Sequence, residues 1–154
     1  MLITSLLDNK AIKAELVSRS KPGVIEELVG CLVSQRQGLV REEIVNALLE
    51  REKLGSTAIG KGVAIPHAKA KGIENVVAAF GRSSQGIDFG AEDGKPVHLF
   101  FLLVAPLDKA GDHLKALAKI AQLVKDESFK KSLLAAKNHG AIFKLMKDKD
   151  EEAR

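Results

Sequence analysis

Hydrophobic and polar positions follow two different periods along this chain. Ile12, Ala14 and Leu16 alternate with polar residues, which is the period of a half-buried strand. After Ser20, Lys21 and Pro22 the spacing becomes helical. That helix would bury Val24, Ile25, Leu28, Val29 and Leu32. The first part of the chain therefore predicts a strand followed by a helix, and Gly38 ends this helical region.

A second helix is predicted from Arg41 to Glu52. Its apolar positions repeat at helical spacing, and Glu42 and Glu43 lie in the first turn, where the helix dipole favours acidic side chains. Glycines then interrupt further helix. Val63 to Ile65 can form a short strand that leads into Pro66 and His67.

Two stronger strands are expected at Val76 to Arg82 and at Val97 to Ala105. The second is almost continuously apolar, which indicates a central strand buried on both faces, and Pro106 ends it. From Asp112 a long amphipathic helix is predicted, followed by shorter helices over Glu127–Ala136 and Gly140–Met146.

The alternation of strands and helices, without an internal repeat, favours one α/β or α+β domain. We expect residues 1–146 to form that domain and the charged segment 147–154 to fray. With 154 residues and 45% hydrophobic composition, the chain can build a sizeable core. Only 4% of residues are aromatic, so base-stacking surfaces would be difficult to form.

Charge and cysteine content restrict the functional classes further. The 24 basic and 20 acidic residues are interleaved, so the net charge of +4 suits an anionic ligand without forming a basic arm. Binding of nucleic acid is thus a weak hypothesis, and we expect none. The single cysteine, Cys31, suits a reducing compartment and the buried face of a helix.

The hydropathy of the chain predicts a cytoplasmic protein without direct membrane insertion. The N-terminus lacks the cationic start and apolar region of a signal peptide, and no apolar run approaches the roughly 18 residues of a membrane span. A membrane-protein partner would therefore be met from the aqueous side.

His67 is the strongest candidate for chemistry because it ends a polar, cationic, glycine-rich segment that begins at Arg51. A near-neutral imidazole can accept and return a phosphoryl group if cations and amide groups hold the phosphoryl oxygens. Arg51 could pair bidentately with those oxygens. Candidate phosphate-binding residues are Ser56 and Thr57 through their hydroxyls, and Gly60 and Gly62 through closely approaching amides.

The other three histidines differ as candidates for binding or catalysis. His113 lies near the start of the long predicted helix, where free amide groups favour an anion, whereas His98 and His139 are given no chemistry. No two histidines have metal-ligand spacing, and no nucleotide-binding loop or GxSxG motif is present. We therefore expect neither a metal site nor a cofactor.

Three segments closely resemble one known family. They are REKLGSTAIGKGVAIPHA, GIDFGAEDGKPVHLFFLLVAP and HLKALAKIAQLVKDESFKKSLLAA. The family comprises the enzyme IIA domains of the bacterial phosphoenolpyruvate-dependent phosphotransferase system, in the fructose, mannitol and nitrogen-regulatory class. The resemblance extends from about Leu6 to Met146 and is most specific between Arg51 and His67.

The resemblance implies an α/β fold with a mixed, mostly parallel sheet flanked by helices on both faces. It also implies that His67 is phosphorylated on Nε2 by the phosphohistidine of the phosphocarrier HPr, or of a paralogue. The phosphoryl group would pass to a IIB domain or serve as a regulatory signal. Arg51 matches the family's active-site arginine, and His113 matches a second histidine beside the first.

Two residues depart from the pattern of the relatives. Ala68 replaces a glycine found in many of them, so a positive φ after His67 is disfavoured. Lys61 replaces an acidic residue of mannitol-type members, which favours the fructose and nitrogen-regulatory branches. We also expect an apolar docking patch near His67, with Ile59, Val63 and Ile65 as candidates.

Two hypotheses remain for the function. The first is a phosphocarrier enzyme, and the second is a non-catalytic regulatory module of the same fold. Such a module would bind a transporter, kinase or transcription regulator according to the phosphorylation of His67.

Overall fold

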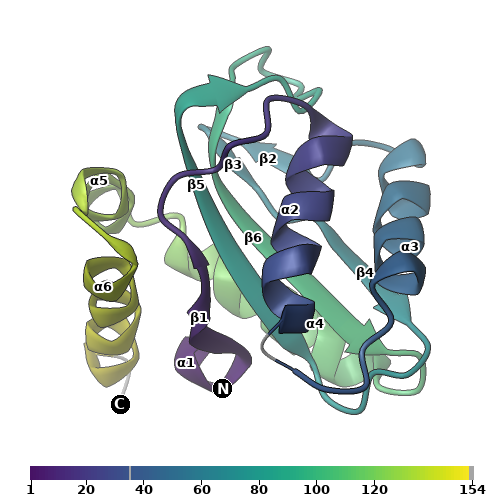
Figure 1. Cartoon of the computed structure of the whole chain (residues 1–154). Helices are drawn as coiled ribbons and strands as arrows, with labels where there is room; N and C mark the ends of the chain where they lie inside the picture. Colours follow the sequence, from purple (N-terminus) through teal and green to yellow (C-terminus); the bar gives the residue numbers. More distant parts are fainter. Residues whose placement is uncertain (35, 153–154) are drawn as a thin grey trace.

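A computed structural model describes residues 1–34 and 36–152 of the chain. Its helices are α1 (Ile3–Leu6), α2 (Lys21–Ser34), α3 (Arg41–Lys53), α4 (Ala110–Leu123), α5 (Glu127–Ala135) and α6 (His139–Glu152). Its strands are β1 (Leu7–Lys13), β2 (Ala58–Gly60), β3 (Val63–Ala64), β4 (His67–Ala70), β5 (Val77–Ile87) and β6 (Val97–Pro106). These elements form one domain around a single sheet (Figure 1).

The sheet is mixed, as the family resemblance implied. Its order is β1-β5-β6-β3-β2, and β4 pairs with β6 beyond the end of β3. The pairs β1–β5, β3–β6 and β4–β6 are parallel, while β5–β6 and β2–β3 are antiparallel. The apolar strand β6 is therefore central, which explains why nearly all of its residues are buried.

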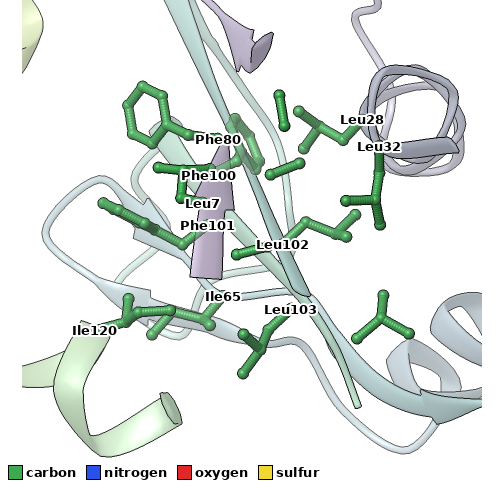
Figure 2. Packing of buried hydrophobic residues seen from close by; sticks show 14 of the residues in the cluster. Leu7, Leu28, Leu32, Ile65, Phe80, Phe100, Phe101, Leu102, Leu103 and Ile120 are labelled. Atoms are coloured by element: carbon green, nitrogen blue, oxygen red, sulfur yellow. The ribbon is translucent and has the colours of Figure 1, made fainter. Parts of the chain in front are cut away.

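Helices cover both faces of the sheet. Figure 1 shows α2 and α3 in front of the strands and α4 behind them. In Figure 2, Leu28 and Leu32 of α2 and Ile120 of α4 lie on opposite sides of the strands. On the side of the strands away from α2, the rings of Phe80 and Phe101 pack edge to face with their centroids 5.0 Å apart (Figure 2). The core therefore fixes the sheet between two helical layers.

Two strands have boundaries that differ from those predicted from the sequence. β1 runs from Leu7 to Lys13 and so begins and ends earlier than the alternation of Ile12, Ala14 and Leu16 suggested. Leu16 still contacts the sheet, because its backbone N–H donates to the Arg82 carbonyl at 2.8 Å. β5 extends to Ile87, five residues beyond the predicted end.

The C-terminal segment corrects the prediction of a frayed tail from Lys147. Helix α6 continues to Glu152, and only Ala153 and Arg154 lie outside the described residues. The physical reason is Asp150, which is 3% exposed and accepts hydrogen bonds from the backbone N–H groups of Ile3 and Thr4, at 2.8 and 3.0 Å. The Thr4 hydroxyl donates to the same carboxylate at 2.6 Å. The two ends of the described chain are thus joined.

Asp150→Asn should lower the free energy of unfolding by about 2–3 kcal/mol, because an amide NH2 would face donors that now meet a charged acceptor. Urea denaturation followed by circular dichroism measures the loss. Asp148→Asn is the matched control, since Asp148 is exposed and, among the residues that the structure describes, pairs only with Lys144 at 3.5 Å. Equal stability of the two variants would show that Asp150 does not fasten α6 to α1.

Over residues 1–34 and 36–152, no helix combines the length and the apolar composition needed to cross a bilayer.

Candidate functional site

His67 is the first residue of β4, where strand pairing and Pro66 fix its backbone. The Pro66 carbonyl accepts a 2.8 Å hydrogen bond from the Leu103 N–H, and His67 is in register with Leu103 of β6. The side chain is half-buried, and its Nδ1 lies 2.6 Å from the Ile65 carbonyl oxygen. A carbonyl oxygen can only accept, so Nδ1 carries the proton and Nε2 keeps its lone pair. The lone pair that stays free is therefore that of Nε2.

His113 lies beside His67, although 46 positions separate the two in sequence. It comes from the first turn of α4, and the two ring centroids are 5.5 Å apart with the rings tilted by 60°. His113 is 6% exposed, so it is more buried than a first-turn position suggested. Its Nδ1 is buried without a hydrogen-bond partner among the described residues. The structure thus pairs the two imidazoles that the sequence singled out.

Arg51 completes this group from the last turn of α3. Its Nη1 donates to the Gly55 carbonyl at 3.0 Å, which leaves other guanidinium N–H groups for a ligand. One open cavity of about 530 Å³ contains Arg51 and both imidazoles. We call it the histidine cavity, and its lining comprises Ala47, Glu50, Arg51, Leu54, His67, Ala68, Lys69 and His113.

Burial keeps both imidazoles neutral. It lowers the pKa of His67, and the positive charge of Arg51 lowers it further, while the Ile65 carbonyl and Glu52 oppose this. Burial also lowers the pKa of His113, with smaller contributions from His67 and Lys69. Both rings are therefore neutral at physiological pH.

The midpoints of ring titration should lie below about 6.5 for His67 and His113, because folding disfavours their charged forms. NMR titration of the ring protons measures them, and the chain unfolded in urea supplies the reference near 6.5. Since only the neutral ring attacks phosphorus, phosphoryl acceptance should stay constant down to about pH 6.5 and fall at lower pH. A His67 midpoint above that of the unfolded chain would contradict this picture.

The structure corrects the predicted phosphate-binding roles of Ser56 and Thr57. The Ser56 hydroxyl donates to the Phe89 carbonyl at 2.6 Å. Thr57 is 5% exposed, and both its hydroxyl and its backbone N–H donate to the buried carboxylate of Glu52. Because these hydroxyls are used within the protein, Thr57 joins the segment before β2 to α3, Ser56 joins it to the segment after β5, and neither lines the histidine cavity.

Gly60 and Gly62 also have structural positions away from the histidine cavity. They flank Lys61 in a tight turn between β2 and β3, with φ of 89° and 83°, and Lys61 itself has φ of 55°. Two successive central residues of positive φ are typical of a type I′ hairpin turn. The Lys61 N–H donates to Asp93 at 3.0 Å, which fixes the turn. Both glycines therefore serve hairpin geometry.

The expected apolar patch of Ile59, Val63 and Ile65 is not found beside His67. Val63 and Ile65 are in the core, 1% and 4% exposed. Ile59 is 52% exposed but lines a different cavity, together with Lys61. The apolar side chain at the histidine cavity is instead Leu54, which is 83% exposed. Leu54 could not be predicted from the sequence, because it follows the last residue of α3, where the helical period no longer indicates which way a side chain points.

The structure also gives the positions of Ala68 and His98 and the arrangement of potential metal-binding side chains. Ala68 lies within β4, paired with Val104, and has no positive φ. His98 Nδ1 lies 2.8 Å from the Ser83 carbonyl, which fits its structural interpretation. Within residues 1–34 and 36–152, no three His, Cys, Asp or Glu side chains are arranged to hold a metal ion.

Fold and cavity together define a mixed α/β domain in which a neutral imidazole lies beside a second imidazole and an arginine. Residues 5–149 match the family described as phosphoenolpyruvate-dependent sugar phosphotransferase system, EIIA 2. The chain belongs to this family, as the resemblance in the sequence predicted.

Named relatives fall into two groups. A nitrogen regulatory protein of Bradyrhizobium diazoefficiens is 42% identical over 146 residues, which cover 95% of each chain. A fructose-specific EIIABC component of Bacillus subtilis is 40% identical over 98% of this chain, which spans only 24% of that longer protein. The crystal structure of the nitrogen regulatory protein IIA-Ntr of Neisseria meningitidis superposes with a TM-score of 0.86 at 33% identity, covering 94% and 98% of the two chains.

Proposed function

We propose that this chain is a phosphocarrier that accepts a phosphoryl group on Nε2 of His67 from the phosphohistidine of HPr or a paralogue. The single observation that carries the proposal is the hydrogen bond between His67 Nδ1 and the Ile65 carbonyl. With the proton on Nδ1, the lone pair of Nε2 is free in a cavity that Arg51 and His113 also line. Membership of the EIIA 2 family also supports a phosphocarrier function.

Phosphoryl transfer at this site needs no proton movement at His67. The lone pair of Nε2 forms the new P–N bond while the P–N bond to the donor imidazole breaks, and the electron pair of that bond stays on the donor nitrogen. The ring of His67 keeps its Nδ1 proton and becomes a phosphorylated imidazolium. The Ile65 carbonyl stabilises that cation, so the phosphoryl group stays on a good leaving group.

Arg51 and His113 have separate roles in this proposal. The guanidinium of Arg51 offsets the charge on the phosphoryl oxygens as the two nitrogens approach in line. The neutral ring of His113, 5.5 Å from His67 between centroids, is placed to donate a hydrogen bond to the same group. Both would act most strongly on the transition state, where charge is spread over three oxygens.

The acceptor of the phosphoryl group distinguishes two versions of the function. The relative from Bacillus subtilis is an EIIABC component, which supports transfer onward to a IIB domain. The relative from Bradyrhizobium diazoefficiens is a nitrogen regulatory protein that this chain matches over 95% of its length, which supports a regulatory target. In the second version, phosphorylation of His67 controls binding and is not passed on.

Phosphorylation in a reconstituted relay tests the proposal. The chain is incubated with phosphoenolpyruvate, enzyme I and HPr, and intact mass is recorded before and after acid treatment. We expect an acid-labile gain of about 80 Da, the mass of one added phosphoryl group. Omission of enzyme I is the control. If the chain stays unmodified with HPr and with several HPr paralogues, the proposal is wrong.

A further inference from the structure

Lys69 lies on the same face of β4 as His67. Along this strand His67 is half-buried, Ala68 is buried, Lys69 is exposed and Ala70 is buried. Successive side chains of a strand point to opposite faces, so His67 and Lys69 emerge on one face about 7 Å apart along the strand. The lysine side chain is a flexible four-carbon stem that can reach a group bound to Nε2 of His67.

Lys69 also lines the histidine cavity and lacks a counter-ion there. Within residues 1–34 and 36–152 it makes neither an ion pair nor a side-chain hydrogen bond. Of the neighbouring cations, Lys53 pairs with Glu50 at 2.8 Å, whereas Arg51 donates one hydrogen bond to the neutral Gly55 carbonyl at 3.0 Å and keeps its charge unbalanced. The charge of Lys69 reaches the imidazoles, since it contributes, after burial and His67, to the lowered pKa of His113.

The unphosphorylated cavity therefore concentrates positive charge without an anion to balance it. Arg51 and Lys69 both line it, and the only carboxylate in its described lining, that of Glu50, is paired with Lys53. A phosphoryl group on His67 would carry a charge of about −1.5 to −2. It would supply the missing anion in the cavity that both His67 and Lys69 line.

We propose that Lys69 is a further phosphoryl-binding residue, whose ammonium group contacts the phosphoryl oxygens on His67 and favours the phosphorylated state of the chain. The proposal rests on phosphoryl transfer at His67. Lys69 shifts the equilibrium between phospho-HPr and this chain toward this chain, since its contact exists only after the P–N bond has formed. Arg51, in contrast, acts mainly on the rate.

The equilibrium constant for transfer from phospho-HPr measures this effect. Purified phospho-HPr is mixed with the chain, and both phosphorylated species are quantified by intact mass at several ratios. Lys69→Met should lower the equilibrium constant about five- to tenfold, which is the effect of losing one well-placed but exposed charge contact. Lys69→Arg should keep it within about twofold, and added salt should reduce the difference between wild type and Lys69→Met.

Lys71→Met is the matched control, because it removes the same charge from an exposed position in the turn after β4, outside the histidine cavity. If Lys69→Met and Lys71→Met have the same equilibrium constant within about twofold, the role of Lys69 is refuted. The wild type would still be phosphorylated in that case, so the proposed function would stand. A wild type that accepts no phosphoryl group would overturn both proposals.

Discussion

Replacement of His67 by alanine is expected to lower phosphoryl acceptance at least about 10⁴-fold, as loss of a nucleophile typically does. His113 cannot substitute for it, since its ring is 6% exposed while the half-buried His67 lies nearer the surface. Transfer of radioactive phosphate from phosphoenolpyruvate through enzyme I and HPr measures the loss.

His139→Ala is the control for this variant, because His139 is an exposed histidine at the start of α6. It should accept phosphate at the wild-type rate. The melting temperature of both variants shows whether either has lost its fold. A folded His67→Ala variant that is phosphorylated as fast as the wild type would refute the assignment of the site.

Arg51→Ala is expected to slow phosphoryl transfer about 10²- to 10³-fold, because it removes a preorganised donor from the developing charge. Arg51→Lys should recover only part of the rate, since an ammonium group cannot form the two parallel hydrogen bonds of a guanidinium. Single-turnover transfer from phospho-HPr, in stopped-flow or quenched-flow format, gives the rate constants.

Lys53→Ala provides the comparison for Arg51. Lys53 lies in the same last turn of α3 and is exposed, so the substitution removes one positive charge at a similar position without emptying the histidine cavity. It should change the rate less than about threefold, as expected for an exposed ion pair. Equal rates for Arg51→Ala and Lys53→Ala would show that Arg51 does not contact the phosphoryl group.

Much of the fold could be predicted because long apolar patterns have one interpretation. The run from Val97 to Ala105, rich in β-favouring residues and ended by Pro106, favours the centre of a sheet, and β6 occupies that position. β4 was not predicted, because HAKA is four residues long and its buried positions are alanines, which carry little hydropathy signal. The burial of Asp150 depends on the N-terminus of the chain, 146 or more residues away, so no local pattern reveals it.

The site was predicted in part for similar reasons. His67 and Arg51 were predicted because they belong to one polar segment, and His113 because it lies near a helix start. The fold brings all three to one cavity. Ser56 and Thr57 have the right chemistry for phosphate, but Phe89 and Glu52 already use their hydroxyls. That competition arises from tertiary contacts. Lys69 had a local signal, the alternation of β4, but the signal has meaning only once β4 is known to be a strand.

The atom that carries the phosphoryl group tests the central claim most directly. The chain is labelled with ¹⁵N, phosphorylated through HPr, and its histidine rings are studied by long-range ¹H–¹⁵N NMR. The hydrogen bond of Nδ1 to the Ile65 carbonyl predicts that the phosphorylated nitrogen is Nε2 of His67, with the proton still on Nδ1. A phosphoryl group on Nδ1 of His67, or on any other residue, would contradict the account.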